Sequence, residues 1–253
     1  MNKILVFIPT YEERENVTPM CEQIMALPLP LDLLFTDDAS PDGTGEELDR
    51  LATIHPRMTV SHRTGKLGIG SAHQEGISYA YRNGYEVLIT MDCDFTHDPK
   101  KIPALLDARP GYQVVLGSRH LQEESLPGWS PTRILLTKFG HFLTRHLLRI
   151  EYDATNAFRL YDLTSIPAGL FKLVRSKSYS FFFESLFVLA TNKIRVREIP
   201  IMLPSRTAGH SKMNLSEVFR SAEFLTKLGL ERMVNPRRFL VSEERAGAKA
   251  ELP

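Results

Sequence analysis

The sequence has little cysteine, almost no net charge and no long apolar run, and each shortage excludes a class of protein. Only Cys21 and Cys93 occur among 253 residues, too few for a disulfide framework or a four-thiolate zinc site. The 31 Lys and Arg nearly balance the 30 Asp and Glu, so the chain lacks the basic character of a general nucleic-acid-binding protein. No apolar run reaches the roughly 20 residues of a membrane-spanning helix. We therefore expect no nucleic acid among its partners.

The residues that are present describe an ordinary globular chain. Hydrophobic residues make up 43% and charged residues 24%, and the length suffices for a substantial core. Lys3 is followed only by a strand-length apolar run that ends at Pro9, unlike a signal peptide. We expect a cytoplasmic protein, soluble or bound peripherally to the cytoplasmic face of a membrane.

Short apolar runs alternate with helical patterns in the first half of the chain. The runs predict buried strands at Lys3–Ile8, Leu31–Thr36, Glu86–Met91 and Gln113–Gly117. Helix-start signals lie between them: Thr44 with Glu47 and Ser71 with Gln74 as capping boxes, and Asp98 before Pro99 as an N-cap. These repeated units predict an α/β fold with a mostly parallel sheet covered by helices on both faces. Binding sites in such folds lie beyond the carboxyl ends of the strands.

The second half contains a segment, Leu126–Ile150, without any acidic residue. A helical wheel places basic side chains on one face, namely Lys138, His141, Arg145 and Arg149. The opposite face is apolar and consists of Leu136, Phe139, Leu143, Leu147 and Ile150. This pattern fits a helix in a membrane interface, and it equally fits a core-packed helix with a solvated basic face. A last helix is predicted over about Asn214–Val234, followed by a disordered tail at 235–253.

Two carboxylates directly after an apolar strand carry the strongest chemical signal. Asp92 and Asp94 stand at i and i+2 and therefore point to the same side of an extended chain, where they could bind a divalent cation. The same spacing occurs in haloacid-dehalogenase-type phosphatases, in which Asp92 would be the nucleophile and Asp94 the acid/base. The alternative without chemistry has Asp92 capping a turn and Asp98 capping the next helix.

Two further loops follow predicted strands or precede predicted helices. Asp37 and Asp38 are adjacent carboxylates at a strand end, where they could accept hydrogen bonds from a ribose hydroxyl or a base N–H. Residues 63–71 form a glycine-rich loop with Arg63 and Lys66 that leads into a helix and would suit an anionic ligand. The second pattern alone has low specificity, because glycine loops before helices are common.

In sequence order, these motifs resemble the dolichol- and polyprenol-phosphate mannose synthases of glycosyltransferase family 2. The resemblance begins with Ile-Pro-Thr-Tyr-Glu-Glu at 8–13 and continues through the Asp-Asp-x-Ser-Pro-Asp-Gly-Thr block and the glycine loop. It includes Asp-Cys-Asp-Phe-Thr-His-Asp-Pro at 92–99, Gly-Ser-Arg at 117–119 and Gly-Trp at 128–129. It covers roughly residues 3 to 232 and implies a GT-A fold. Because the phosphatase motif stands near the start of its domain without such blocks upstream, the resemblance disfavours that alternative.

The resemblance implies roles for residues at matching positions. The nucleoside of a sugar nucleotide would be held by Pro9, Tyr11, Glu13, Thr36 and Asp38. Asp92, Cys93 and Asp94 would lie along the donor diphosphate, with Asp94 the principal ligand of Mg²⁺ or Mn²⁺ and Asp92 assisting. The acceptor phosphate and the diphosphate would be gathered by Arg119, Arg133 and Arg206, assisted by Lys212.

The resemblance implies an inverting, metal-dependent transfer of mannose from GDP-mannose to polyprenyl or dolichyl phosphate, at a membrane surface. One domain would span 1–234, with a nucleotide-sugar half at about 1–119 and an acceptor half at about 120–234. The chain departs from the family at Asn156 and Ala157, where relatives have Ser-Gly or Gly-Ser, and in lacking the transmembrane helices of many relatives. A UDP-glucose donor, a membrane-protein partner for attachment and a non-catalytic sugar-nucleotide-binding protein remain alternatives.

Overall fold

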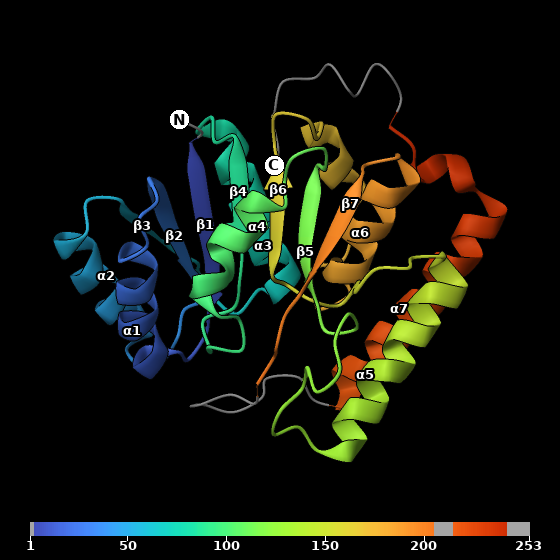
Figure 1. Cartoon of the computed structure of the whole chain (residues 1–253), viewed down its shortest axis with the longest axis horizontal. Coiled ribbons are helices and arrows are strands. Elements are labelled where there is room, and N and C mark those ends of the chain that lie inside the picture. Colours follow the sequence, from blue (N-terminus) through green and yellow to red (C-terminus); the bar gives the residue numbers. More distant parts are fainter. Residues whose placement is uncertain (1–2, 205–214, 242–253) are drawn as a thin grey trace.

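The computed structural model describes residues 3–204 and 215–241, and its centre is a seven-stranded sheet (Figure 1). The strands are β1 (Ile4–Thr10), β2 (Leu31–Asp37), β3 (Met58–His62), β4 (Val87–Thr90), β5 (Val114–Ser118), β6 (Arg159–Asp162) and β7 (Val196–Pro200). The α-helices are α1 (Arg14–Met25), α2 (Thr44–Ile54), α3 (Ile69–Arg82), α4 (Ile102–Asp107), α5 (Pro131–Leu143), α6 (Phe181–Thr191) and α7 (Leu215–Val234). Shorter helical turns are η1 (Pro99–Lys101), η2 (Thr144–Leu148, a π-helix), η3 (Ala168–Leu173) and η4 (Pro236–Phe239).

The strand order is β3-β2-β1-β4-β6-β5-β7, and only β6 runs against the others. The carboxyl ends of β1, β2 and β4 therefore meet at one edge of the sheet. Because β6 is antiparallel, the residues that precede it arrive at that same edge. The sheet thus brings loops from both halves of the sequence together.

Successive strand residues point into two separate cores, as the alternation of a β-strand requires. Leu5 and Phe7 of β1 belong to the core on one face, where α3 and α6 supply the helical layer. Val6 and Ile8 belong to the core on the other face, which α1, α2 and α4 cover. The predicted α/β sheet with helices on both faces is confirmed, and the four predicted strands correspond to β1, β2, β4 and β5.

Helices begin at or near all three predicted starts, but the two predicted capping boxes do not form. Thr44 lies inside the first turn of α2, and its hydroxyl donates to Asp42 Oδ1 at 2.6 Å. Ser71 lies inside α3, where its hydroxyl bonds to the carbonyl of Gly68 at 2.7 Å. In both cases the hydroxyl has a closer local partner than the backbone N–H of a capping box. The third start is confirmed, because the Asp98 carboxylate accepts from the N–H of Lys100 at 2.9 Å.

The second half also differs from the expected pattern. The segment without acidic residues forms α5 and then one π-helical turn, and the described part of α5 contains no buried residue. The core-packed interpretation is therefore wrong for most of α5 but right for its end and for the residues that follow, because Leu143 and Leu147 pack on the core and Ile150 is buried. The predicted tail is wrong over 235–241, because Phe239 in η4 is 1% exposed and packs on Phe187 of α6. The rest of the tail, and Asn214, lie outside the described residues.

Candidate active site

A cavity of about 290 Å³ opens at the carboxyl ends of β1, β2 and β4. Its lining is Pro9, Thr10, Tyr11, Glu13, Asp38, Lys66, Gly68, Ile69, Ala72, Asp92, Cys93, Asp94, Ser178, Tyr179 and Glu217. Eight residues predicted from the sequence are therefore brought together here: Pro9, Tyr11, Glu13, Asp38, Lys66, Asp92, Cys93 and Asp94. Thr36 is 1% exposed and is not among the lining residues.

The carboxylate pair after β4 is held in a fixed orientation. Asp94 is 2% exposed, and its Oδ1 accepts from both the N–H and the hydroxyl of Thr96, at 3.1 and 2.6 Å. This contact requires the chain to turn back at Phe95, which has a φ of 59°. Such a left-handed conformation is uncommon for a bulky residue and is retained where the surroundings determine it. One oxygen of Asp94 is thus committed to the loop, and the carboxylate faces the cavity.

The two adjacent carboxylates after β2 have different functions. Asp37 accepts hydrogen bonds from the N–H and hydroxyl of Ser40 and from the hydroxyl of Thr10, so it shapes the loop. Asp38 lines the cavity and pairs with Arg63 at 2.5 Å. Arg63, expected to suit an anionic ligand, is instead a buried support for Asp38. Lys66 lines the cavity, with its ammonium 3.9 Å from the centre of the Tyr11 ring.

The loop at 63–71 needs glycine at positions 68 and 70 because the segment before α6 passes close to its backbone. A Cβ on Gly68 would lie 2.4 Å from the carbonyl oxygen of Lys177, and one on Gly70 would lie 2.6 Å from that of Ser178. The N–H of Ser71 also donates to Lys177 at 3.2 Å. The segment before α6 is therefore packed directly on the start of α3, and it brings Tyr179 to the cavity.

We expect Gly70→Ala to destabilise the protein and to distort this wall of the cavity. The added methyl group would meet backbone atoms that cannot rotate away, and overpacking of this kind costs about 1–3 kcal/mol. Gly65→Ala is the matched control, because nothing lies within 4 Å of its Cβ. Urea unfolding of the two variants measures the difference. Equal stability of the two variants would contradict the close packing.

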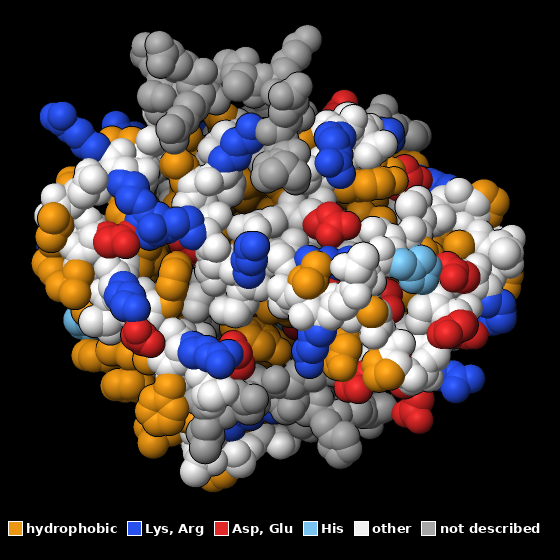
Figure 2. Space-filling model, turned by 180° about the vertical axis from the view of Figure 1, so that it is seen from behind, with side chains coloured by type: hydrophobic (Ala, Val, Ile, Leu, Met, Phe, Trp, Pro, Cys, Tyr) orange, Lys and Arg blue, Asp and Glu red, His pale blue; other side chains and the backbone are white. Residues whose placement is uncertain are grey.

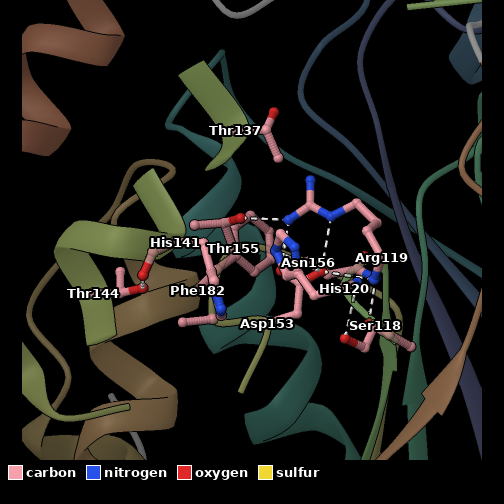
Figure 3. Close-up of polar contacts among 12 residues, drawn as sticks. Ser118, Arg119, His120, Thr137, His141, Thr144, Asp153, Thr155, Asn156 and Phe182 are labelled. Carbon is pink, nitrogen blue, oxygen red and sulfur yellow. Dashed lines mark hydrogen bonds and ion pairs between the residues drawn. The ribbon is translucent and has the colours of Figure 1, made fainter. Parts of the chain in front are cut away.

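Arg119, which was predicted to bind phosphate, forms a buried ion pair in the structure (Figure 3). Its Nε and Nη2 donate to the two oxygens of Asp153 at 2.8 and 2.6 Å, and Nη2 also donates to the Thr155 hydroxyl at 2.5 Å. Arg119 is 8% exposed and is not among the residues that line the cavity. Burial would raise the pKa of Asp153, but the Arg119 guanidinium holds that pKa well below its usual range. In this conformation Arg119 fixes the segment before β6.

His120 and His141 stack beside this ion pair, with ring centres 4.0 Å apart. Burial lowers the pKa of His120 to about 4, opposed by Asp153 and reinforced by His141, Arg119 and Lys138. Burial also lowers the pKa of His141, while the carboxylate of Asp153 again opposes the shift. The folded protein therefore keeps both rings neutral at pH values where the unfolded chain would bind protons.

We expect the melting temperature to fall as the pH is lowered from 6.5 towards 4. A histidine with a depressed pKa binds its proton only in the unfolded chain over this interval, so its contribution to the free energy of unfolding decreases there as the pH falls and is constant above it. His120→Phe keeps an aromatic ring on His141 and should show a smaller decrease. Differential scanning calorimetry across this pH range measures both proteins. Identical slopes for the two proteins would contradict the assignment to His120.

The remaining predicted residues lie elsewhere. Arg133 is exposed near the start of α5, with its guanidinium 3.7 Å from the centre of the Trp129 ring, and it does not line the described cavity. Arg206 and Lys212 fall at 205–214, outside the described residues. Sequence analysis missed Ser178, Tyr179 and Glu217. They reach the cavity by tertiary packing, and no local motif marks them.

Comparison with known proteins identifies the family. The model of glycosyl transferase family 2 matches residues 5–180. The polyprenol monophosphomannose synthase of Mycolicibacterium smegmatis is 35% identical over 237 residues, which cover 91% of this chain and 89% of that protein. The undecaprenyl-phosphate mannosyltransferase of Micrococcus luteus is 33% identical over 229 residues, covering 90% of this chain and 94% of that protein.

Solved structures support the fold. Mannosyl-3-phosphoglycerate synthase from Rubrobacter xylanophilus superposes with a TM-score of 0.64 at 17% identity, covering 100% of this chain and 79% of that one. Glucosyl-3-phosphoglycerate synthase from Mycobacterium tuberculosis, solved with Mn²⁺, UDP and glucosyl-3-phosphoglycerate, gives a TM-score of 0.62 at 14% identity over 96% of this chain and 82% of that one. The family match decides against the phosphatase interpretation of Asp92 and Asp94. A mixed α/β sheet, paired carboxylates at its edge and the match over 5–180 lead to one conclusion: this chain belongs to glycosyltransferase family 2.

Proposed function

We propose that this protein transfers mannose from GDP-mannose to polyprenyl phosphate with inversion at the anomeric carbon. The identity of 35% with a polyprenol monophosphomannose synthase over 91% of this chain is the observation that carries the proposal. The cavity is consistent with it, because carboxylates and an ammonium group face a space at the carboxyl ends of three strands.

The donor would lie along the cavity with its nucleoside towards Pro9, Tyr11, Glu13 and Asp38. The Asp38 carboxylate, oriented by Arg63, can accept hydrogen bonds from a ribose hydroxyl or a base N–H. Lys66 is placed to offset the negative charge of a diphosphate. Its ammonium would have to leave the face of the Tyr11 ring to do so, which would free that ring for the base.

A divalent cation, Mg²⁺ or Mn²⁺, would be bound by Asp94 with the help of Asp92. The described residues contain no group of three or more His, Cys, Asp or Glu side chains that could hold a metal by themselves. Two carboxylates and the oxygens of a substrate diphosphate form the kind of site that Mg²⁺ occupies. The residues therefore fit a cation that binds together with the donor and supplies positive charge to the departing nucleoside diphosphate.

The reaction needs little acid/base chemistry from the protein. A phosphate oxygen of the acceptor is already an anion, and it forms a bond to the anomeric carbon as the bond to the diphosphate oxygen breaks. The harder task is to hold two anions side by side. We assign that task to Lys66 in the cavity and to Arg133, Arg206 and Lys212, while Arg119 holds Asp153 and the segment before β6 in place.

The acceptor lipid would be presented at a membrane surface by an apolar platform on α5 and α7. We define the platform as Leu135, Leu136, Phe139 and Phe142 of α5 with Phe219, Leu230, Met233 and Val234 of α7, each 48–85% exposed. Both helices lie on the β7 side of the molecule (Figure 1), and α7 packs on η2, with Gly229 against Leu147. Figure 2 shows hydrophobic side chains with nearby Lys and Arg gathered on that side. No helix of the described residues could span a bilayer.

The direct test is a transfer assay with labelled GDP-mannose, a polyprenyl phosphate and Mg²⁺ or Mn²⁺, followed by organic extraction of the product. UDP-glucose, in the same assay, tests the alternative donor. If label enters the organic phase only with GDP-mannose, the proposal is supported. If label enters that phase only with UDP-glucose, the donor is UDP-glucose and not GDP-mannose. Label with neither donor would contradict the transfer reaction.

A further inference from the structure

Behind the carboxylate pair lies a chain of hydrogen bonds that no motif of the sequence indicates. The N–H of Asp92 donates to Nδ1 of His97 at 2.9 Å. The other ring nitrogen, Nε2, lies 2.8 Å from Oδ1 of Asn156. His97 and Asn156 are 2% and 3% exposed, so both are inside the protein and beside the cavity wall.

The partners determine which ring nitrogen of His97 carries the proton. A backbone N–H can only donate, so Nδ1 must offer its lone pair to Asp92 and the proton must be on Nε2. Nε2 then donates to Asn156, whose amide is oriented because its Nδ2 donates to the carbonyl of Gly117 at 2.7 Å. The Asp92 carboxylate lies 3.7 Å from Nδ1, beyond hydrogen-bond distance.

Asn156 is itself fixed from two sides. Its Oδ1 also accepts from the N–H of Phe158 at 3.1 Å, and its carbonyl accepts from Nε of the fully buried Arg159 at 2.7 Å. The His97 ring stacks on Phe158, with centres 5.3 Å apart and planes at 15°. Asn156 therefore connects the ends of β5 and β6 to the loop after β4.

We propose that His97 and Asn156 are positioning residues that set the main-chain geometry of Asp92 and thereby the distance between the carboxylates of Asp92 and Asp94. This rests on the proposed binding of a divalent cation by those carboxylates. Without the Nδ1 acceptor, the part-buried N–H of Asp92 loses this hydrogen bond, and the loop must rearrange to replace it. Groups that orient metal ligands typically contribute 10–100-fold to metal affinity.

The test is Mn²⁺ binding in the presence of GDP, followed by the loss of the free-ion signal in electron paramagnetic resonance and compared with the loss that GDP alone causes. We expect Asn156→Ala to weaken Mn²⁺ binding roughly 10-fold or more. Asn192→Ala is the matched control, because Asn192 also makes three hydrogen bonds with its side chain, to Val188, Phe239 and Val241, at the far end of α6. Both variants should lose melting temperature, and only Asn156→Ala should lose metal affinity.

Two substitutions of His97 test the contributions of its two ring nitrogens separately. The amide of Asn can take the place of Nδ1, and the longer Gln can take the place of Nε2. We expect His97→Asn to retain more Mn²⁺ affinity than His97→Gln, because the contact with Asp92 is the one that acts on the carboxylate. The ¹⁵N signals of the His97 ring can be assigned because they are absent from the spectrum of His97→Asn. In the wild-type protein these signals should show the proton on Nε2.

The outcomes distinguish this inference from the proposed function. If Asp94→Asn loses Mn²⁺ binding while Asn156→Ala binds with wild-type affinity, the positioning role is overturned and the metal site stands. A proton on Nδ1 of His97 would also overturn it. If the wild-type protein with GDP binds no more Mn²⁺ than GDP alone, or if Asp94→Asn binds as much as the wild type, the metal site and the positioning role are both wrong.

Discussion

Asp94→Asn is expected to lower the rate of mannose transfer by roughly 10²-fold or more while leaving the fold intact. The amide oxygen of Asn can still accept from the N–H and hydroxyl of Thr96, so the loop after β4 keeps its shape. The amide has no charge, however, and it is a poor ligand for a divalent cation that must also hold a diphosphate. The measurement is the transfer rate, together with the melting temperature of the variant.

Asp98→Asn is the control for this substitution. Asp98 belongs to the same loop, but its carboxylate caps η1 and is exposed, outside the cavity lining. The Asp98→Asn variant should transfer mannose at the wild-type rate. Chelation of divalent cations should abolish wild-type activity, and added Mn²⁺ should restore it. A wild-type rate in Asp94→Asn would show that the carboxylate is not the metal ligand.

Reversing two charges, one on α5 and one on η2, is expected to release the protein from anionic liposomes. Lys138 and Arg145 are exposed, and each basic residue near such a surface contributes about 1 kcal/mol. Lys138→Glu with Arg145→Glu should therefore weaken binding by at least about 30-fold, the equivalent of 2 kcal/mol. Arg149 is left unchanged because it has a φ of 57° and ends η2, so its substitution would also alter the backbone. Co-sedimentation at low salt measures the binding.

The matched control reverses two charges at the other end of the sheet, with Arg50→Glu and Arg57→Glu. Both side chains are exposed, on α2 and beside β3, and each takes part in a surface ion pair. Such pairs contribute little to stability. This variant should sediment with liposomes like the wild type, and both double variants should transfer mannose to a short, water-soluble prenyl phosphate. Equal retention of the two variants on liposomes would contradict docking through α5.

The sequence predicted those parts of the fold that local pattern determines. The strands β1, β2, β4 and β5 are largely apolar because helices cover both of their faces. β3 and β7 were missed because they are edge strands with several half-exposed side chains, which removes the apolar run. β6 was missed because it begins with a charged residue, Arg159. That guanidinium is buried only because the carbonyls of Ala154, Asn156 and Phe182 surround it.

Local sequence pattern likewise predicted only part of the candidate site. The sequence indicates Asp92 and Asp94 by their spacing after an apolar strand. It indicates Asp38 because this residue directly follows another carboxylate, Asp37, at a strand end. The ion pair of Arg119 with Asp153 and the contact of His97 with Asn156 join residues that are 34 and 59 positions apart, and only the sheet order brings them together. The wheel of Leu126–Ile150 predicted an amphipathic helix but could not show that Leu136 and Phe139 would be exposed while Ile150 is buried.

The position of β6 in the sheet has a consequence for synthesis of the protein. β4 pairs with β1 on one side and with β6 on the other, so its second edge has no partner until Arg159–Asp162 have left the ribosome. The first half of the chain can therefore form a small parallel sheet during translation, but one with an open edge strand whose first three residues are apolar. Open edges of this kind promote pairing with other chains. A ribosome that pauses between β5 and β6 would hold the protein in its most aggregation-prone state.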